Sequence, residues 1–284
     1  MWPRCQTGVA FASRGRFAQH SAGLQAISRN VDGRPTRIRR KGIYLLPNLL
    51  TTGALFAGFY AIIAAIDGNF RCAAWSFFAA MFLDGLDGRV ARLTSTSSEF
   101  GKEYDSLSDM VSFGLAPAIV TYQWGVARLA EYGAAWGRLG WLAAFLYCAA
   151  AAFRLARFNA NTGQDRRFFQ GLPSPSAAAI VASMVWLATH YEIEGLIGLT
   201  AGITVTAVAG LLMMSRFAYV SFKEISPGKR VRFANLLLIP LAIIAIAIAP
   251  QVTIFALFVI YASSGPGAWL WHRRRAKRAE TGVA

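Results

Sequence analysis

Long apolar stretches follow one another along this chain, and mostly short polar connections separate them. Apolar runs of about 18 residues or more with few charges are typical of membrane-spanning helices. The pattern predicts about eight of them, at residues 43–66, 70–91, 104–125, 139–158, 173–190, 195–214, 233–249 and 252–271. We therefore expect an all-α polytopic membrane protein that folds as a helical bundle.

Polar, basic sequence flanks this apolar region on both sides. Residues 1–41 are rich in arginine and contain Asp32 as their only acid, which predicts a disordered basic arm at an anionic membrane surface. A transit peptide has a similar composition and remains an alternative. Residues 42–272 form the predicted transmembrane domain, and residues 273–284 form a basic tail.

The composition supports a membrane protein over a nucleic-acid-binding one. Of the 284 residues, 55% are hydrophobic and 15% are charged, whereas a soluble domain has about a quarter of its residues charged. The net charge of +15 could indicate a nucleic-acid partner, but no motif with interleaved aromatic residues accompanies it. Basic loops that face anionic headgroups account for the charge, so we expect no nucleic-acid partner.

The distribution of basic residues predicts how the chain lies in the membrane. Nearly all lysines and arginines fall in the N-terminal arm, in the connections after the second, fourth and sixth predicted helices, and in the tail. The positive-inside rule places these segments, and so both termini, in the cytoplasm.

Four aspartates lie on this same predicted side. Asp84 and Asp87 are three residues apart near the end of the second predicted helix, and Asp105 and Asp109 are four apart near the start of the third. Each pair shares one helix face, and antiparallel packing would bring the pairs together. Carboxylates that converge in apolar surroundings repel one another unless they bind hard divalent cations, which suits Mg²⁺ or Mn²⁺.

Three alternative roles for the aspartates fit the sequence less well than a metal site. Each could pair with an arginine of the segments GRVAR or RLARFN, but four acids at these spacings, in a chain with only 14, favour metal binding. A divalent-cation transporter would need acids along the whole path, and these lie at one end only. A purely structural scaffold would not require four neighbouring carboxylates.

Small residues beside the aspartates indicate the kind of ligand. Gly88 and Ala91 lie on the helix turns next to Asp87, and Gly101 precedes the second pair. Small residues let a flat ligand or another helix approach the backbone closely. Two metals beside such a surface suit linked phosphates, because metals can stabilise both the entering and the leaving oxygen of an in-line displacement.

These residues carry a family resemblance. Residues 84–92 read DGLDGRVAR, and residues 101–109, after a spacer of eight, read GKEYDSLSD. This arrangement resembles the signature D-x2-D-G-x2-A-R, spacer, G-x3-D-x3-D of the CDP-alcohol phosphatidyltransferase family, with every position filled. Across about residues 41–250, segments such as LLPNLLTTG, RLARFN and FFQGLPSPSAAA are similar to the integral-membrane phosphatidylserine synthases of that family.

The resemblance implies roles for individual residues. Asp84, Asp87 and Asp105 would hold two divalent metals, and Asp109 would contact the metals and act as the general base. The residues that would face the nucleotide are Gly88 and Ala91 beside the cytidine, and Arg92 at its phosphates. The substrates would be CDP-diacylglycerol and L-serine, with phosphatidylserine and CMP as products.

The family also implies a homodimer, and we expect the chain in the bacterial inner membrane with its active site facing the cytoplasm. Glycerol 3-phosphate, inositol phosphate and choline remain alternative acceptors. A phosphorylated acceptor would call for more basic residues at its pocket.

Further polar residues have two interpretations each. Asn48 and Thr51 either cap the first helix after Pro47 or contact the nucleotide. Arg154 and Arg157 either extend to the membrane interface or bind the lipid-side phosphate and the serine carboxylate, for which guanidinium is well suited. We expect binding roles for the two arginines.

Overall fold

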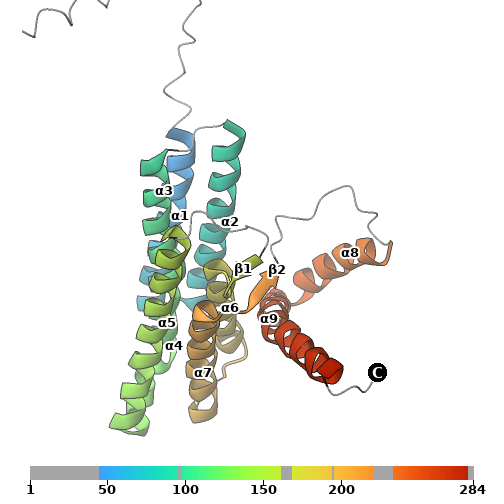
Figure 1. The fold of residues 1–284 in the computed structure, drawn as a ribbon. Helices are drawn as coiled ribbons and strands as arrows, with labels where there is room; N and C mark the ends of the chain where they lie inside the picture. Colours follow the sequence, from blue (N-terminus) through green and yellow to red (C-terminus); the bar gives the residue numbers. More distant parts are fainter. Residues whose placement is uncertain (1–44, 95–97, 161–167, 194, 221–232, 281–284) are drawn as a thin grey trace, which may run out of the picture. The chain divides into compact units, whose positions relative to one another are not determined.

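The structure is a computed structural model that describes residues 45–94, 98–160, 168–193, 195–220 and 233–280. The predicted N-terminal arm, residues 1–41, lies outside these ranges. The described residues are almost entirely helical, which confirms the all-α prediction (Figure 1).

Among the described residues, each predicted apolar segment lies almost entirely within helix. The elements in chain order are α1 (Leu45–Ile66), α2 (Phe70–Thr94), α3 (Glu99–Asp109), η2 (Met110–Leu115), α4 (Ala116–Trp124), η3 (Val126–Tyr132), α5 (Ala134–Ala160), β1 (Phe168–Gln170), α6 (Ser174–His190), α7 (Gly195–Met214), β2 (Ala218–Val220), α8 (Phe233–Ile248) and α9 (Pro250–Glu280). The last helix continues through residues 273–280, so most of the predicted tail is helical.

Four of the described helices are long and apolar enough to cross a membrane. They cover Leu46–Ile66, Ala134–Ala160, Gly195–Met214 and Pro250–Arg275. The protein is therefore an α-helical membrane protein, and the number of eight spans stays a prediction.

The segment expected as one helix at 104–125 is divided by the π-helix η2, and Pro117 explains the division. In an α-helix the N–H of residue 117 would bond the carbonyl of Phe113, but proline has no N–H. The Ala116 N–H instead bonds Val111 O, which is the spacing of a π-turn. The buried Tyr147 hydroxyl on α5 donates to Phe113 O at 3.0 Å, so the released carbonyl is satisfied.

A second proline and tyrosine repeat this arrangement in α9. Pro266 cannot donate to Ala262 O, and the buried Tyr219 hydroxyl donates to that oxygen at 3.0 Å. Gly265 makes room for the tyrosine, because a Cβ at this position would lie 2.5 Å from Tyr219 Cζ. The long helix thus keeps its buried carbonyl bonded where proline interrupts the ladder.

We expect Tyr147→Phe to lower the free energy of unfolding by about 1–2 kcal/mol, because it leaves the buried Phe113 carbonyl without a donor. Thermal unfolding of the purified protein in detergent measures the change. Tyr122→Phe, at a more exposed tyrosine on α4, is the matched control and should unfold like the unchanged protein. Equal loss in both variants would contradict this role of Tyr147.

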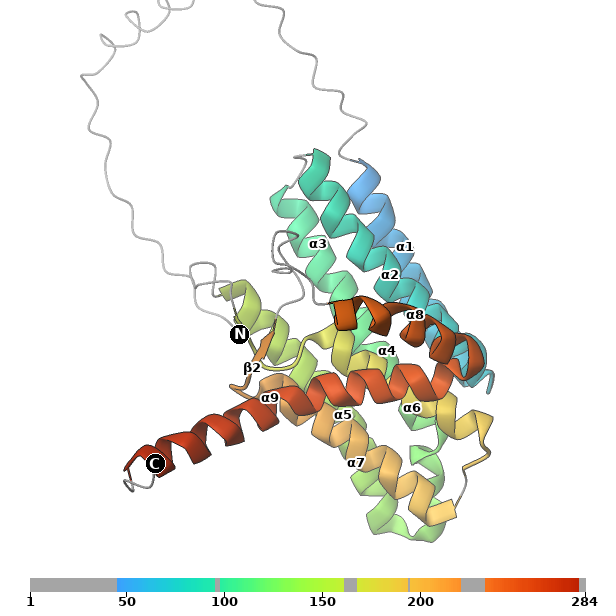
Figure 2. The same ribbon diagram turned by 90° about the vertical axis from the view of Figure 1, so that its right-hand side faces the viewer.

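Close packing sets the position of α1 against α3 and η2. Gly58 allows the approach, since a Cβ there would lie 2.4 Å from Ser112 Oγ. Ser112 donates to Ala54 O and Ser108 donates to Thr51 O, both at 3.2 Å. In both views α1, α2 and α3 lie side by side (Figure 1 and Figure 2). This arrangement fixes α3, with its two aspartates, against α1.

Helix α6 lies at the centre of the packing and contacts α2, α4, α7 and α9. Most of its residues are buried, and many of them are alanine or serine, which permit close helix approach. Strands β1 and β2 pair antiparallel with Phe169 opposite Tyr219, which joins the connection after α5 to the connection after α7. Neither strand was expected from the apolar pattern.

Candidate functional site

Three of the four predicted aspartates converge. Asp84 lies near the C-terminal end of α2, while Asp105 and Asp109 lie one turn apart on α3. One carboxylate oxygen of each lies within 4.8 Å of one oxygen of each of the others, and all three residues are half-buried. The two helices therefore supply a compact group of oxygen atoms, which we call the aspartate cluster.

The aspartate cluster fits a hard divalent cation. Asp105 Oδ1 is buried and has no hydrogen-bond partner among the described residues, so one acceptor of the cluster is left unsatisfied by them. A buried acceptor without a donor is costly, and neighbouring negative charges add repulsion. Carboxylate oxygens are the ligands that Mg²⁺ and Mn²⁺ prefer, and a cation here would relieve both costs.

Asp87 lies outside this group of three and has a different partner. It is buried, and its Oδ2 accepts a hydrogen bond of 2.7 Å from the hydroxyl of Thr51 on α1. It remains near enough to Asp84 and Asp105 for mutual electrostatic repulsion. The structure thus connects Thr51, predicted separately, to the signature aspartates.

The starts of α1 and α3 also meet. Ser98 caps α3 by accepting a bond of 3.0 Å from the Gly101 N–H. A Cβ at Gly101 would lie 3.3 Å from Asn48 Oδ1, so the glycine lets the half-buried asparagine approach the α3 backbone. One helical turn on, Thr52 Oγ1 and Tyr104 Oη lie 2.9 Å apart. Asn48, a predicted nucleotide residue of α1, therefore lies against the first turn of α3, one turn before Asp105.

Arg154 faces the aspartate cluster from α5. Its guanidinium lies near enough to Asp109 for electrostatic attraction. It also donates a hydrogen bond to the fully buried hydroxyl of Ser174, the first residue of α6. Ser174 thereby holds the arginine in place from a second helix.

Arg157, one turn later, meets backbone carbonyls. Its guanidinium donates to Gln170 O at 2.6 Å, and Met214 O and Ser215 O lie at 3.4 and 3.5 Å. Gly171, which follows Gln170, has a φ of +85° that favours glycine. A Cβ at this position would also lie only 2.3 Å from Met213 O. Arg157 thus ties the end of α5 to β1 and to the end of α7.

The small residues of α2 border open space. Apart from the adjoining residues and backbone of its own helix, no atom of the described part of the chain lies within 4 Å of a Cβ placed on Gly88, and this glycine is exposed. Ala91 is half-buried and Arg92 is exposed in the last turn of the helix. This face of α2 is accessible to a ligand next to Asp84 and Asp87.

Sequence reasoning missed several features of the site. Ser174, which bonds Arg154, lies in the noticeable segment GLPSPS, but the sequence does not reveal which arginine this serine contacts. Tyr104 precedes Asp105 and carries no pattern of its own. The π-helix that begins directly after Asp109 has its cause in Pro117, and π-turns are frequent at functional sites.

Comparisons with known proteins agree with this geometry. The family model described as CDP-alcohol phosphatidyltransferase matches residues 44–214, which contain all four aspartates, Arg154 and Arg157. A protein of Helicobacter pylori named CDP-diacylglycerol–serine O-phosphatidyltransferase is 39% identical over 223 residues, covering 77% of this chain and 90% of the relative.

More distant relatives carry related names. A protein of Mycobacterium bovis with the same name is 32% identical over 244 residues, covering 81% of this chain and 79% of the relative. The archaetidylserine synthase of Methanothermobacter thermautotrophicus is 35% identical over 176 residues, covering 61% and 69%. The family model matches more than half of this chain, and the helices bring the signature aspartates together. This chain therefore belongs to the CDP-alcohol phosphatidyltransferase family of membrane enzymes.

Proposed function

We propose that this enzyme transfers the phosphatidyl group of CDP-diacylglycerol to the hydroxyl of L-serine, giving phosphatidylserine and CMP. The bond between the serine oxygen and phosphorus forms as the bond from phosphorus to the CMP oxygen breaks. The names of the bacterial relatives support serine as the acceptor. The observation that carries the proposal is the convergence of Asp84, Asp105 and Asp109 with the unsatisfied Asp105 Oδ1.

The aspartate cluster would hold the metals. Asp84, Asp105 and Asp109 supply the inner oxygens, and Asp87, positioned by Thr51, completes a site for two ions of Mg²⁺ or Mn²⁺. When bound, such ions neutralise charge on the linked phosphates and on the leaving oxygen. The helix pair presents the carboxylates in a half-buried place, where each charge interaction is stronger than in water.

Asp109 would accept the proton of the serine hydroxyl. It is the last residue of α3 and lies near the guanidinium of Arg154. A carboxylate is a weak base, so close positioning of the hydroxyl supplies much of the acceleration. The proton leaves serine for Asp109 as the new oxygen–phosphorus bond forms.

The remaining predicted residues would position the substrates. Asn48 of α1 and the exposed face of α2 at Gly88, Ala91 and Arg92 would contact the cytidine nucleotide. Thr51, which is buried, would support this site by holding Asp87. Arg154, near Asp109, would bind the serine carboxylate or the lipid-side phosphate directly. Arg157 contributes to the same subsite by holding β1 and the end of α7 beside it.

The surroundings of the reaction complete the proposal. The diacylglycerol chains remain in the bilayer while the nucleotide enters from the cytoplasm, where the positive-inside rule puts the aspartates. The location would be the bacterial inner membrane, with both termini cytoplasmic and the enzyme assembled as a homodimer.

The test is CMP release by the purified protein with CDP-diacylglycerol and Mg²⁺ or Mn²⁺. L-serine, glycerol 3-phosphate, inositol phosphate and choline are offered in parallel. Of the four acceptors, we expect only L-serine to cause CMP release, and we expect no release when EDTA removes the metal. Release with another acceptor would leave the proposed role of the aspartates unchanged but would contradict serine as the acceptor. Metal flux into liposomes without CMP release would instead support the transporter.

A further inference from the structure

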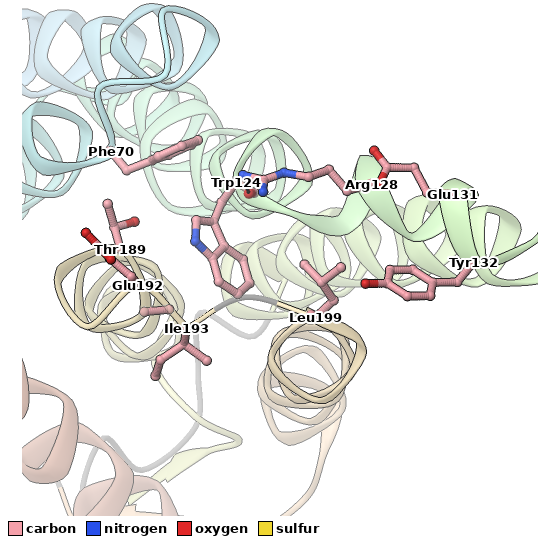
Figure 3. Close-up of a pocket in the computed structure, with 11 residues that line it drawn as sticks. Phe70, Trp124, Arg128, Glu131, Tyr132, Thr189, Glu192, Ile193 and Leu199 are labelled. Atoms are coloured by element: carbon pink, nitrogen blue, oxygen red, sulfur yellow. Dashed lines mark hydrogen bonds between the residues drawn. The ribbon is translucent and has the colours of Figure 1, made fainter.

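A cavity with both polar and apolar walls lies at the end of the helices opposite to the aspartate cluster. It has a volume of about 240 Å³ and lies where α2 and α7 begin and where α4 and α6 end. Figure 3 shows Thr189 and Glu192 on one side of Trp124, and Arg128 and Glu131 on its other side. None of these residues belongs to the signature or to the reaction described above.

The charges in this cavity have both signs. Arg128 donates to the backbone carbonyl of Trp124 at 3.2 Å, which holds its guanidinium at the end of α4. Glu131 and Glu192 supply two carboxylates from separate elements, η3 and the turn after α6. One guanidinium and two carboxylates around an aromatic ring suit a zwitterion that pairs an anionic phosphate with an ammonium group.

Glu192 stands where a glycine is usual. The Ile193 N–H bonds Ala188 O at 2.8 Å across the end of α6, which is a Schellman turn, and Glu192 occupies its left-handed position with φ of 48°. A side chain at such a position is unfavourable compared with glycine. Glycine can therefore replace Glu192 without disturbing the turn, which makes Glu192→Gly a useful variant.

An apolar groove lies beside this cavity, between α5 and α7. Its volume is about 470 Å³, and it is lined mainly by apolar side chains of the two helices, together with Thr200 and Thr204. Its two threonines are internally satisfied, since Thr200 donates to Ile197 O and Thr204 to Thr200 O. Both helices are long and apolar enough to span a membrane, so hydrocarbon chains would be the natural neighbours of this groove.

The cavity and the groove share the start of α7. Leu199 lines the cavity and the next residue, Thr200, lines the apolar groove. On the other side, Tyr132 at the end of η3 lines the cavity, and Trp136 in the first turn of α5 lines the groove. A pocket with charged side chains at the helix ends, continued by an apolar groove along the same helices, matches the two parts of a phospholipid.

We propose that this end of the protein binds a phospholipid with an amine-bearing zwitterionic headgroup, the chemistry of phosphoethanolamine. The phosphate pairs with Arg128, the ammonium group pairs with Glu192 on the other side of Trp124, and an acyl chain occupies the groove between α5 and α7. Because the carboxylates outnumber the guanidinium, lipids with a net negative headgroup bind less well. The site is separate from the aspartate cluster and does not rest on the proposed function.

Native mass spectrometry of the purified full-length protein in detergent tests the proposal. Phosphatidylethanolamine, phosphatidylglycerol and free phosphoethanolamine are titrated separately. We expect the first to bind best, by about tenfold, as for one additional charge-assisted hydrogen bond. Free phosphoethanolamine, which lacks the chains, should not displace it. Equal binding of phosphatidylglycerol, or displacement by the free headgroup, would overturn the proposal.

Variants separate this site from the others. Arg128→Gln and Glu192→Gln should each weaken phosphatidylethanolamine binding by about tenfold. Arg138→Gln, at an exposed arginine of α5 outside the cavity, and Asp109→Asn, at the opposite end, should not change it. Retained binding in both cavity variants, or equal loss in Asp109→Asn, would overturn the proposal.

Glu192→Gly distinguishes loss of the site from loss of the fold. The change removes the carboxylate and also relieves the left-handed backbone, so the lipid-free protein should unfold at a higher temperature. Phosphatidylethanolamine binding should nevertheless weaken as in Glu192→Gln. A glycine variant that unfolds at a higher temperature and binds this lipid as tightly as the unchanged protein would overturn the role of Glu192.

Discussion

Replacing Asp109 with asparagine should lower serine-dependent CMP release by about a hundredfold to ten-thousandfold, the usual contribution of a general base. Asparagine has nearly the shape of aspartate, but its amide cannot take the proton of the attacking hydroxyl, and it is a poorer metal ligand. The loss should appear mainly in kcat, because the nucleotide residues on α1 and α2 are unchanged. Initial rates at saturating CDP-diacylglycerol and serine measure the effect.

Asp67→Asn is the matched control for this change. Asp67 is an exposed aspartate between α1 and α2, at the opposite end of these helices from the aspartate cluster, and its variant should keep the full rate. Thermal unfolding of both variants shows whether the fold is retained. A folded Asp109→Asn protein that keeps most of its activity would rule out Asp109 as the base.

Asp105→Asn should change stability and activity in opposite directions. In metal-free protein the substitution removes one of several repelling carboxylates, so the temperature of unfolding should rise. The same change removes a metal ligand, so CMP release should fall by at least about a hundredfold, as for loss of a major electrostatic contribution. A single substitution that both stabilises the metal-free protein and removes most of its activity is expected where the carboxylates coordinate a bound cation.

Thermal unfolding with EDTA and with excess Mn²⁺ measures this directly. In the unchanged protein, metal at a hundred times its dissociation constant should stabilise the fold by about 2.7 kcal/mol, and Asp105→Asn should lose most of that gain. Glu103→Gln, at an exposed carboxylate on the same helix, should behave like the unchanged protein in both conditions. An Asp105→Asn protein that is less stable in EDTA, or that keeps the Mn²⁺ shift, would contradict the assigned role.

The helices were predictable because hydrophobicity along a chain is a local property. The apolar run at 195–214 corresponds to α7 residue for residue, and the run at 70–91 corresponds to α2 except for one further turn at its C-terminal end. The break in the run at 104–125 was not predicted. It depends on Pro117, and its structural cost is offset by a hydroxyl from Tyr147, thirty-four residues away, which no local pattern contains.

The same division applies to the site. The spacings of three and four residues, in a sequence that fills every position of the signature, were enough to predict that Asp84, Asp87, Asp105 and Asp109 act together. Only the packing of α1, α2 and α3 shows that Asp84, Asp105 and Asp109 converge, while Thr51 on α1 holds Asp87. Arg154 and Arg157 look equivalent in the sequence but have different partners, because Arg154 meets Ser174 at the start of α6 and Arg157 meets the backbone of β1.

Local sequence thus determined the helices, the membrane character and the family of this protein, because periodicity, hydropathy and short motifs act over a few residues. Tertiary packing decided the grouping of three aspartates around Asp105 Oδ1, the pairing of Asp87 with Thr51, and the cavity that holds Arg128 and Glu192. These features depend on how far helices distant in the chain approach and rotate against one another. That geometry is set by glycines, serines and buried tyrosines whose partners lie on other helices.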